Sequence, residues 1–379
     1  MSIVSLALCM IVKNEEFFIE KCLKNIYDLF DEIIIVDTGS TDKTIEICQK
    51  YNAKIFKFQW INDFSAARNF ALAQVNINCN WILVLDADEI IESTALKKLK
   101  EKLATVSADV YGFYFERLNN ESADFFKQNR DNFIIRLFRN NCNIKYAGKI
   151  HEVVDASIFA QNKKVLKSDI LILHLAYQKG EQFELEKSKF YEQLLLAEIN
   201  DNPKNIKLYI CLALEYERRQ DYKKELEILK NGLSAAGAQP ILLFRLGLLL
   251  AAHFNDLDSA YNYLFQAQML LNQKKDFDKH NDNEYKQLIF TLAQVCFKLG
   301  KYLEAEAWIN ELSMLQKFES AEFYNLACLI FEKTNKLDSL IIYYNKLLEL
   351  NSNAEIMLKL AAVFIKKNEF LRALDLTKK

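Results

Sequence analysis

Residues 81–89 have the sequence WILVLDADE, an apolar run that ends in carboxylates. The run Trp81–Leu85 has the pattern of a short strand that is covered on both faces. Asp86 and Asp88 follow it, and residues two apart in an extended segment point to the same side. Both are expected at the carboxyl end of a parallel strand, where open α/β sheets bind ligands. Oxygen ligands there suit Mg²⁺ or Mn²⁺ shared with a substrate phosphate, although Asp-x-Asp after a strand is also common in plain loops.

The rest of the first half alternates strands with helices. We expect strands at 2–12, 32–36, 54–58 and 81–85, and helices at 14–27, 43–51, 64–75 and 93–107. Later strands are expected at 110–116, 133–138 and 170–174, without helices between them. This order predicts an α/β, Rossmann-like domain with a mostly parallel sheet and a smaller α+β addition.

The second half is helical and repetitive. A pair of one large and one small residue recurs at steps of 34, 46, 34 and 34 residues, at positions 212–213, 246–247, 292–293, 326–327 and 360–361. Small residues recur in the following helix at Ala260, Ala305, Ser339 and Ala373. The long step indicates an insertion at Gln273–Glu284. A period of 34 is typical of stacked helix pairs, and this region resembles the tetratricopeptide family.

These patterns predict two domains, residues 1–180 and residues 181–379. The second would form an all-α solenoid whose concave face binds peptides or proteins. Alternatively, the repeats form a homodimer or brace the first domain.

Composition limits the class of partner and the compartment. The chain has 49 basic and 51 acidic residues and a net charge of −2, which argues against a nucleic-acid partner. Its 8 cysteines include no C-x-x-C pair, as in buried, reduced thiols of a reducing compartment. The N-terminal run lacks the features of a signal peptide and is too short to span a bilayer. We therefore expect a cytoplasmic protein.

A second carboxylate, Asp37, ends the neighbouring strand. The turn Asp37–Asp42 contains a glycine and several side-chain oxygens that could hold a base or a ribose. Alternatively, Asp37, Ser40 and Thr41 only cap the next helix. The sequence VDTGS also occurs in aspartic proteases, but here it opens a helix inside a βαβ series. Haloacid dehalogenase phosphatases place their Asp-x-Asp on the first strand, which this chain does not.

Other candidates stand further along the chain. Arg68 follows small residues that allow close packing on the sheet, and it is either a clamp for a diphosphate or a surface helix arginine. Glu152 is either a base for an acceptor hydroxyl or a solvated carboxylate at a strand end. His174 ends an apolar strand as a core residue, a metal ligand or a phosphate contact.

Four motifs in order carry a resemblance. They are MIVKNE (10–15), VDTGSTD (36–42), FSAARN (64–69) and LDADE (85–89). Together they resemble the catalytic domain of glycosyltransferase family 2, a GT-A fold, over roughly residues 2–180. The branch is similar to the one that includes the sublancin S-glycosyltransferase, where segments like Gly148–Glu152 and His174 recur. The chain departs from it at Ala176, where we expect glycine, and this weakens the assignment of His174.

The resemblance implies a metal-dependent, inverting transfer from a nucleotide sugar. Asp86, Asp88 and His174 would hold Mn²⁺ or Mg²⁺, and Glu152 would act as the base beside the catalytic Asp88. The donor-binding residues would be Asn14, Glu15, Asp37, Ser40, Arg68 and Asp86.

A UDP-sugar is the expected donor, because uridine is the usual nucleotide in the family. The preferred hypothesis for the acceptor is a peptide or a protein, since repeats of this kind can bind peptides. The alternatives are transfer to a lipopolysaccharide or capsule precursor, and a repeat scaffold with an inactive transferase domain.

Overall fold

The computed structural model describes residues 4–119, 133–175, 180–274, 282–315, 318–351 and 353–377. Residue contacts divide the chain into two compact units, Met1–Glu198 and Ile199–Lys379. The boundary at residue 180, drawn from the onset of amphipathic helical spacing, stays a prediction. Two positions discussed above are affected: Ala176 and most of the insertion expected at Gln273–Glu284 lie outside the described residues.

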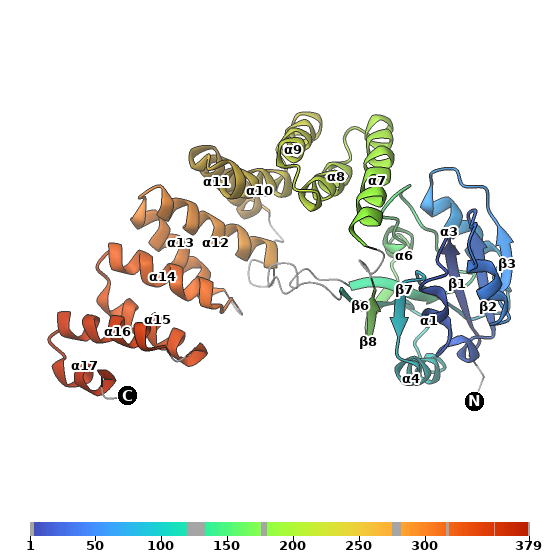
Figure 1. The fold of residues 1–379 in the computed structure, drawn as a ribbon, viewed down its shortest axis with the longest axis horizontal. Coiled ribbons are helices and arrows are strands. Elements are labelled where there is room, and N and C mark those ends of the chain that lie inside the picture. The colour runs from blue at the N-terminus through green and yellow to red at the C-terminus, as the bar shows by residue number, and fades with distance from the viewer. Residues whose placement is uncertain are drawn as a thin grey trace. The chain divides into compact units, whose positions relative to one another are not determined.

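The first unit is built on a mixed sheet (Figure 1). Within the described residues its strand order is β3-β2-β1-β4-β7-β6-β8-β5. The strands are β1 (Leu6–Val12), β2 (Glu32–Asp37), β3 (Lys54–Lys57), β4 (Trp81–Val84), β5 (Glu89–Ile91), β6 (Val110–Asn119), β7 (Phe133–Arg139) and β8 (Lys164–His174). β3, β2, β1 and β4 are mutually parallel, whereas β7 is antiparallel to β4 and β6. The predicted α/β class is confirmed.

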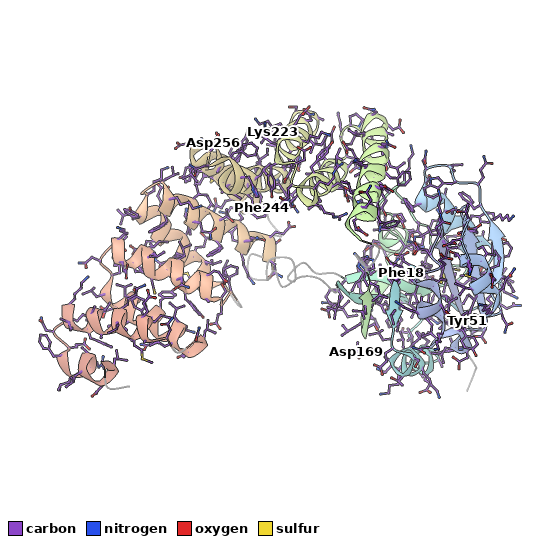
Figure 2. The ribbon with its side chains drawn as sticks, viewed as in Figure 1. Phe18, Tyr51, Asp169, Lys223, Phe244 and Asp256 are labelled. Atoms are coloured by element: carbon purple, nitrogen blue, oxygen red, sulfur yellow. The ribbon has the colours of Figure 1, made fainter. Side chains whose placement is uncertain are left out.

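Helices cover both faces of this sheet. They are α1 (Ile19–Leu23), α2 (Thr44–Gln49), α3 (Phe64–Ala73), α4 (Ser93–Leu103) and α6 (Asp155–Phe159), and α7 (Glu181–Asp201) follows. Alternate residues of β2 join different cores: Ile33 and Ile35 pack with α1, α2 and α4, while Ile34 packs with α3 and α6. Phe18, just before α1, is 2% exposed (Figure 2). The unbroken apolar runs of the central strands follow from burial on both faces.

Some elements differ from expectation. The helix expected at 14–27 shrinks to α1 and a 3₁₀ turn at Tyr27–Leu29, because Asn14 has a φ of 55° and cannot continue a helix. The strand β5 was not expected, since three residues are too few to show a pattern. The segment Tyr146–Val154 contains only an isolated bridge, between Ala147 and Val153.

The second unit is a series of paired helices (Figure 1). They are α8 (Ile206–Arg218), α9 (Tyr222–Ala236), α10 (Pro240–Leu249), α11 (Leu257–Asn272), α12 (Asn283–Lys298), α13 (Tyr302–Met314), α14 (Ala321–Lys333), α15 (Leu337–Leu350), α16 (Ala354–Lys366) and α17 (Phe370–Thr377). A π-helical turn, Leu250–Phe254, follows α10. Asp256 caps α11 by accepting a hydrogen bond from the Ser259 N–H at 3.1 Å (Figure 2).

The repeated large–small pairs lie in the first helix of each helix pair. The small members include Ala213, Ala293 and Ala327, all fully buried. In the second helices Ala260 and Ala305 are also fully buried. The tetratricopeptide-like architecture expected from the 34-residue period is confirmed. None of the described helices is both long enough and apolar enough to cross a bilayer.

Candidate active site

A charge network lies at the carboxyl end of β4 and centres on Asp86. Arg68 of α3 donates from Nη2 to Oδ1 of Asp86 at 2.6 Å, and Arg136 of β7 donates from Nη2 to Oδ2 at 2.6 Å. Burial alone would raise the pKa of Asp86, but the charges of Arg136 and Arg68 outweigh it and hold that pKa well below its usual range. The carboxylate of Asp86 is therefore ionised, and the two arginines fix its orientation.

Glu89 extends the network into the core. It is fully buried, accepts from Arg136 Nη2 at 2.5 Å and accepts from the Asp86 N–H at 3.0 Å. Burial raises the pKa of Glu89, and the Arg136 charge opposes this only in part. Arg136 thus ties β7 to the end of β4.

Glu152 joins the same network from the loop before α6. Its Oε1 accepts from Arg68 Nε at 2.5 Å, and its side chain is 11% exposed. Asn69 fixes this loop by exchanging two hydrogen bonds with the backbone of Tyr146, at 2.9 and 3.0 Å. Arg68 Nη1 and the Tyr146 hydroxyl are buried without a hydrogen-bond partner in the described residues, which marks an unfilled polar position here.

Asp88 pairs with a different residue. Its Oδ2 lies 3.2 Å from Nε2 of His174, and its carbonyl accepts from the Leu175 N–H at 2.8 Å. Burial would raise the pKa of Asp88, but the hydrogen bond from His174 lowers it on balance. β5 and β8 bring the two residues together, because Glu89 pairs with His174 in the ladder.

The two carboxylates were expected to share one direction, yet their partners differ. β4 ends at Val84, and the chain turns so that the Glu89 N–H bonds the Asp86 carbonyl at 3.0 Å. Asp88 is therefore not part of an extended strand, and its side chain need not point to the same side as that of Asp86.

The fit of a metal ion can be tested on these side chains. Within the described residues no group of three or more His, Cys, Asp or Glu side chains is arranged to hold a metal. Asp88 and His174 offer a carboxylate and an imidazole, and Mg²⁺ commonly takes one or two carboxylates and completes its shell with water and substrate phosphate. The pair fits such a shared site. Asp86 faces two arginines, and its role as a ligand stays a prediction.

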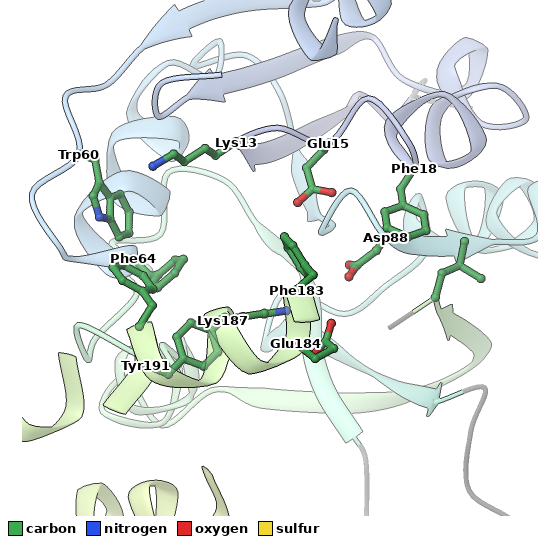
Figure 3. Close-up of a pocket in the computed structure, with 12 residues that line it drawn as sticks. Lys13, Glu15, Phe18, Trp60, Phe64, Asp88, Phe183, Glu184, Lys187 and Tyr191 are labelled. Carbon is green, nitrogen blue, oxygen red and sulfur yellow. The ribbon is translucent and has the colours of Figure 1, made fainter. Parts of the chain in front are cut away.

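A pocket of about 190 Å³ opens beside Asp88 (Figure 3). This volume is smaller than the roughly 300 to 1,000 Å³ that is usual for sites of drug-sized ligands. The aromatic rings of Trp60, Phe64 and Tyr191 gather on one side, and the carboxylates of Glu15, Asp88 and Glu184 lie on the other (Figure 3). The remaining lining residues are Lys13, Phe18, Leu175, Phe183, Lys187 and Phe190.

The turn after β2 contributes no residue to this lining. Asp37 Oδ1 accepts from the Ser40 N–H at 2.9 Å, and Ser40 Oγ accepts from the Asn14 N–H at 3.0 Å. Asp42, rather than Asp37, accepts from the Thr44 N–H at the start of α2, at 2.9 Å. Of the predicted site residues, Asp88 and Glu15 line the pocket, and Asp86, Arg68 and Glu152 form the network behind it.

Sequence reasoning missed several of these residues. Arg136 stands in the middle of the apolar strand FIIRLFR, and an arginine flanked by apolar residues on both sides signals a buried partner. Glu89 directly follows the Asp-x-Asp pair. The α7 residues of the pocket carried no signal, because amphipathic spacing looks alike in a repeat helix and a pocket wall.

Comparison with known proteins identifies the first unit. Residues 7–166 match the family described as Glycosyl transferase family 2. The SPbeta prophage-derived glycosyltransferase SunS of Bacillus subtilis is 34% identical over 144 residues, which cover 38% of this chain and 33% of SunS. A TPR repeat-containing protein of Synechococcus elongatus is 32% identical over 266 residues, which cover 67% of this chain and 63% of that protein.

The chain thus spans less than two thirds of the length of each of these relatives. Among solved structures, MamA from Desulfovibrio magneticus aligns over 46% of this chain and 91% of the MamA chain. The sequence identity is 18% and the TM-score is 0.37. The resemblances drawn from the four motifs and from the 34-residue period are confirmed. Residues 7–166 of this chain thus form a domain that matches glycosyl transferase family 2, and tetratricopeptide-like repeats follow that domain.

Proposed function

We propose that this chain is a metal-dependent, inverting glycosyltransferase that moves a sugar from a nucleotide sugar to a peptide or protein acceptor. The observation that carries the proposal is the Asp88–His174 pair at the edge of a pocket, in a domain of glycosyl transferase family 2. The pair, the pocket and the charge network lie at the ends of β4 and β8, where an α/β sheet places its ligands.

Asp88 and His174 would hold Mn²⁺ or Mg²⁺. The metal, when bound, would neutralise charge on the departing nucleoside diphosphate. Arg68 supports the same role, because its buried Nη1 has no partner in the described residues and suits a phosphate oxygen. Asp86 would keep Arg68 in place. The linked turn of Asn14 and Ser40 would meet the nucleoside, UDP being the expected one.

Glu152 is the proposed base for the acceptor. The acceptor would attack the anomeric carbon opposite to the leaving group, so that a single displacement inverts this centre. One carboxylate oxygen of Glu152 is already taken by the hydrogen bond from Arg68. A thiol acceptor is already partly ionised near neutral pH and needs less help. The repeat helices favour a peptide or protein acceptor, since stacked repeats offer an extended binding surface.

The test is release of nucleoside diphosphate from a panel of nucleotide sugars with Mn²⁺. We expect Asp88→Asn to lower turnover by about a hundredfold or more, because it removes a charged metal ligand. Chelation by EDTA should abolish turnover, and added Mn²⁺ or Mg²⁺ should restore it.

Glu101→Gln is the matched control, because Glu101 is an exposed carboxylate on α4. It should leave turnover unchanged. Wild-type protein that binds no nucleotide and turns over no common donor would favour the non-catalytic scaffold.

A further inference from the structure

Helix α7 follows the family-2 domain and forms a wall of the pocket (Figure 3). It lies beyond the matched residues 7–166, and its pocket residues are Phe183, Glu184, Lys187, Phe190 and Tyr191. They belong to the unit Met1–Glu198, so the wall and the sheet are parts of one compact body.

Aromatic contacts fix how α7 faces the pocket. The ring centre of Tyr191 lies 6.1 Å from that of Phe64 and 6.1 Å from that of His151. The ring of Phe190 lies 6.5 Å from that of Trp60. Residues four apart share a helix face, so the anchoring of Tyr191 also turns Lys187 to the pocket.

Lys187 brings positive charge to the side of the pocket that holds Asp88. Its chain extends from α7 toward Phe183 and Glu184 (Figure 3). Burial alone would lower the pKa of Lys187, but Tyr191 and the carboxylates of Asp88 and Glu184 raise it on balance, so its ammonium group is charged at neutral pH.

The second lysine of the pocket, Lys13, lies on the side of the pocket away from Asp88. Lys13, after β1, extends toward Trp60 on the aromatic side (Figure 3). Of these two lysines, Lys187 is the one on the side of the pocket that holds Asp88, where a diphosphate would meet the Asp88–His174 pair. An ammonium group offers three donors and full charge, and phosphate oxygens accept such charge-assisted bonds well.

We propose that Lys187 binds the diphosphate of the donor, so that the helix after the family-2 domain completes the donor site. This inference rests on the proposed function. It assigns Lys187 a binding role, and it makes α7 part of the transferase rather than of the repeats alone.

The experiment measures binding to the full-length chain by calorimetry with Mn²⁺ present. The probes are the diphosphates of uridine, guanosine, cytidine, adenosine and thymidine, and the parent nucleoside of whichever binds. We expect Lys187→Ala to weaken binding of the diphosphate by about tenfold to a hundredfold, the loss usual for a hydrogen bond to a charged group. Its affinity for the nucleoside should not change, and Lys187→Arg should restore most of the diphosphate affinity.

Lys189→Ala is the matched control, because Lys189 is an exposed lysine two positions along the same helix. It should bind the diphosphate as the wild type does. Equal diphosphate affinity in wild type and Lys187→Ala would overturn the inference and leave the proposed function standing. An equal loss of nucleoside and diphosphate affinity would also overturn it, because Lys187 would then only support the fold. Wild-type protein that binds none of the five diphosphates would remove both proposals.

Discussion

At the scale of single residues, Arg136 holds together the charged end of β4. One guanidinium nitrogen serves both Asp86, at 2.6 Å, and the fully buried Glu89, at 2.5 Å. A buried ion pair contributes little net stability when complete, but removal of one partner leaves an uncompensated charge. The network therefore fixes geometry and makes the site sensitive to loss of any member.

We predict that Arg136→Met lowers the free energy of unfolding by about 3 kcal/mol, because Glu89 loses its ion-pair partner in the core. Urea denaturation of the purified chain measures this change. The double variant Arg136→Met with Glu89→Gln should recover part of the loss, since the buried charge is then gone.

Lys102→Met is the control for this prediction, because Lys102 is exposed in the last turn of α4. It should change the unfolding free energy by no more than about 0.5 kcal/mol. If Arg136→Met unfolded like the control, Glu89 would be neutral in the folded protein and the network would be weaker than its geometry indicates.

At the scale of elements, the close packing of α10 on α11 depends on Gly247. The other first helices carry alanine at the equivalent position, for example Ala293 in α12. A Cβ atom on Gly247 would lie 2.4 Å from Cγ of Leu264. The side chain of Leu264 thus occupies the space that the alanine fills elsewhere.

We predict that Gly247→Ala destabilises the repeat unit by about 1 to 3 kcal/mol, the usual cost of overpacking. The expected effect is thus the opposite of the usual one, because replacing glycine by alanine in a helix interior normally stabilises the protein by about 1 kcal/mol. Thermal unfolding followed by circular dichroism measures the shift. The added variant Leu264→Ala should relieve the clash, so that the two changes together cost less than their sum. A higher melting temperature for Gly247→Ala alone would show that Leu264 moves aside freely.

At the scale of the whole molecule, the end of α7 is the place to separate the two activities that we propose. A chain that ends at Asp201 keeps the unit Met1–Glu198 and every residue of the pocket. We predict that it still binds nucleoside diphosphate and hydrolyses the donor, but loses transfer to peptide acceptors. Calorimetry and a transfer assay measure the two properties separately.

A chain that ends at Gly180 provides the contrast, because it lacks α7 and with it Lys187 and Tyr191. It should lose affinity for the diphosphate. Unimpaired sugar transfer to a peptide by the chain that ends at Asp201 would remove the main support for acceptor binding by the repeats.

The sequence alone determined the class of each half and most of the order of strands and helices, apart from the short strand β5. Apolar runs such as Ile33–Val36 mark strands buried on both faces, and a spacing of 34 residues marks paired helices, because both patterns depend on local periodicity. It also placed Asp86 and Asp37 at the ends of strands, since each directly follows an apolar run.

Only the tertiary structure decided which side chains meet. Asp86 pairs with Arg68 and Arg136, which stand 18 and 50 positions away along the chain, whereas Asp88 pairs with His174. These pairings depend on the end of β4 at Val84 and on the position of β7 and β8 beside it, which no local pattern encodes. The role of α7 in the pocket is decided in the same way, because a helix with buried aromatic residues has the same spacing whether it packs on a repeat or closes a binding site.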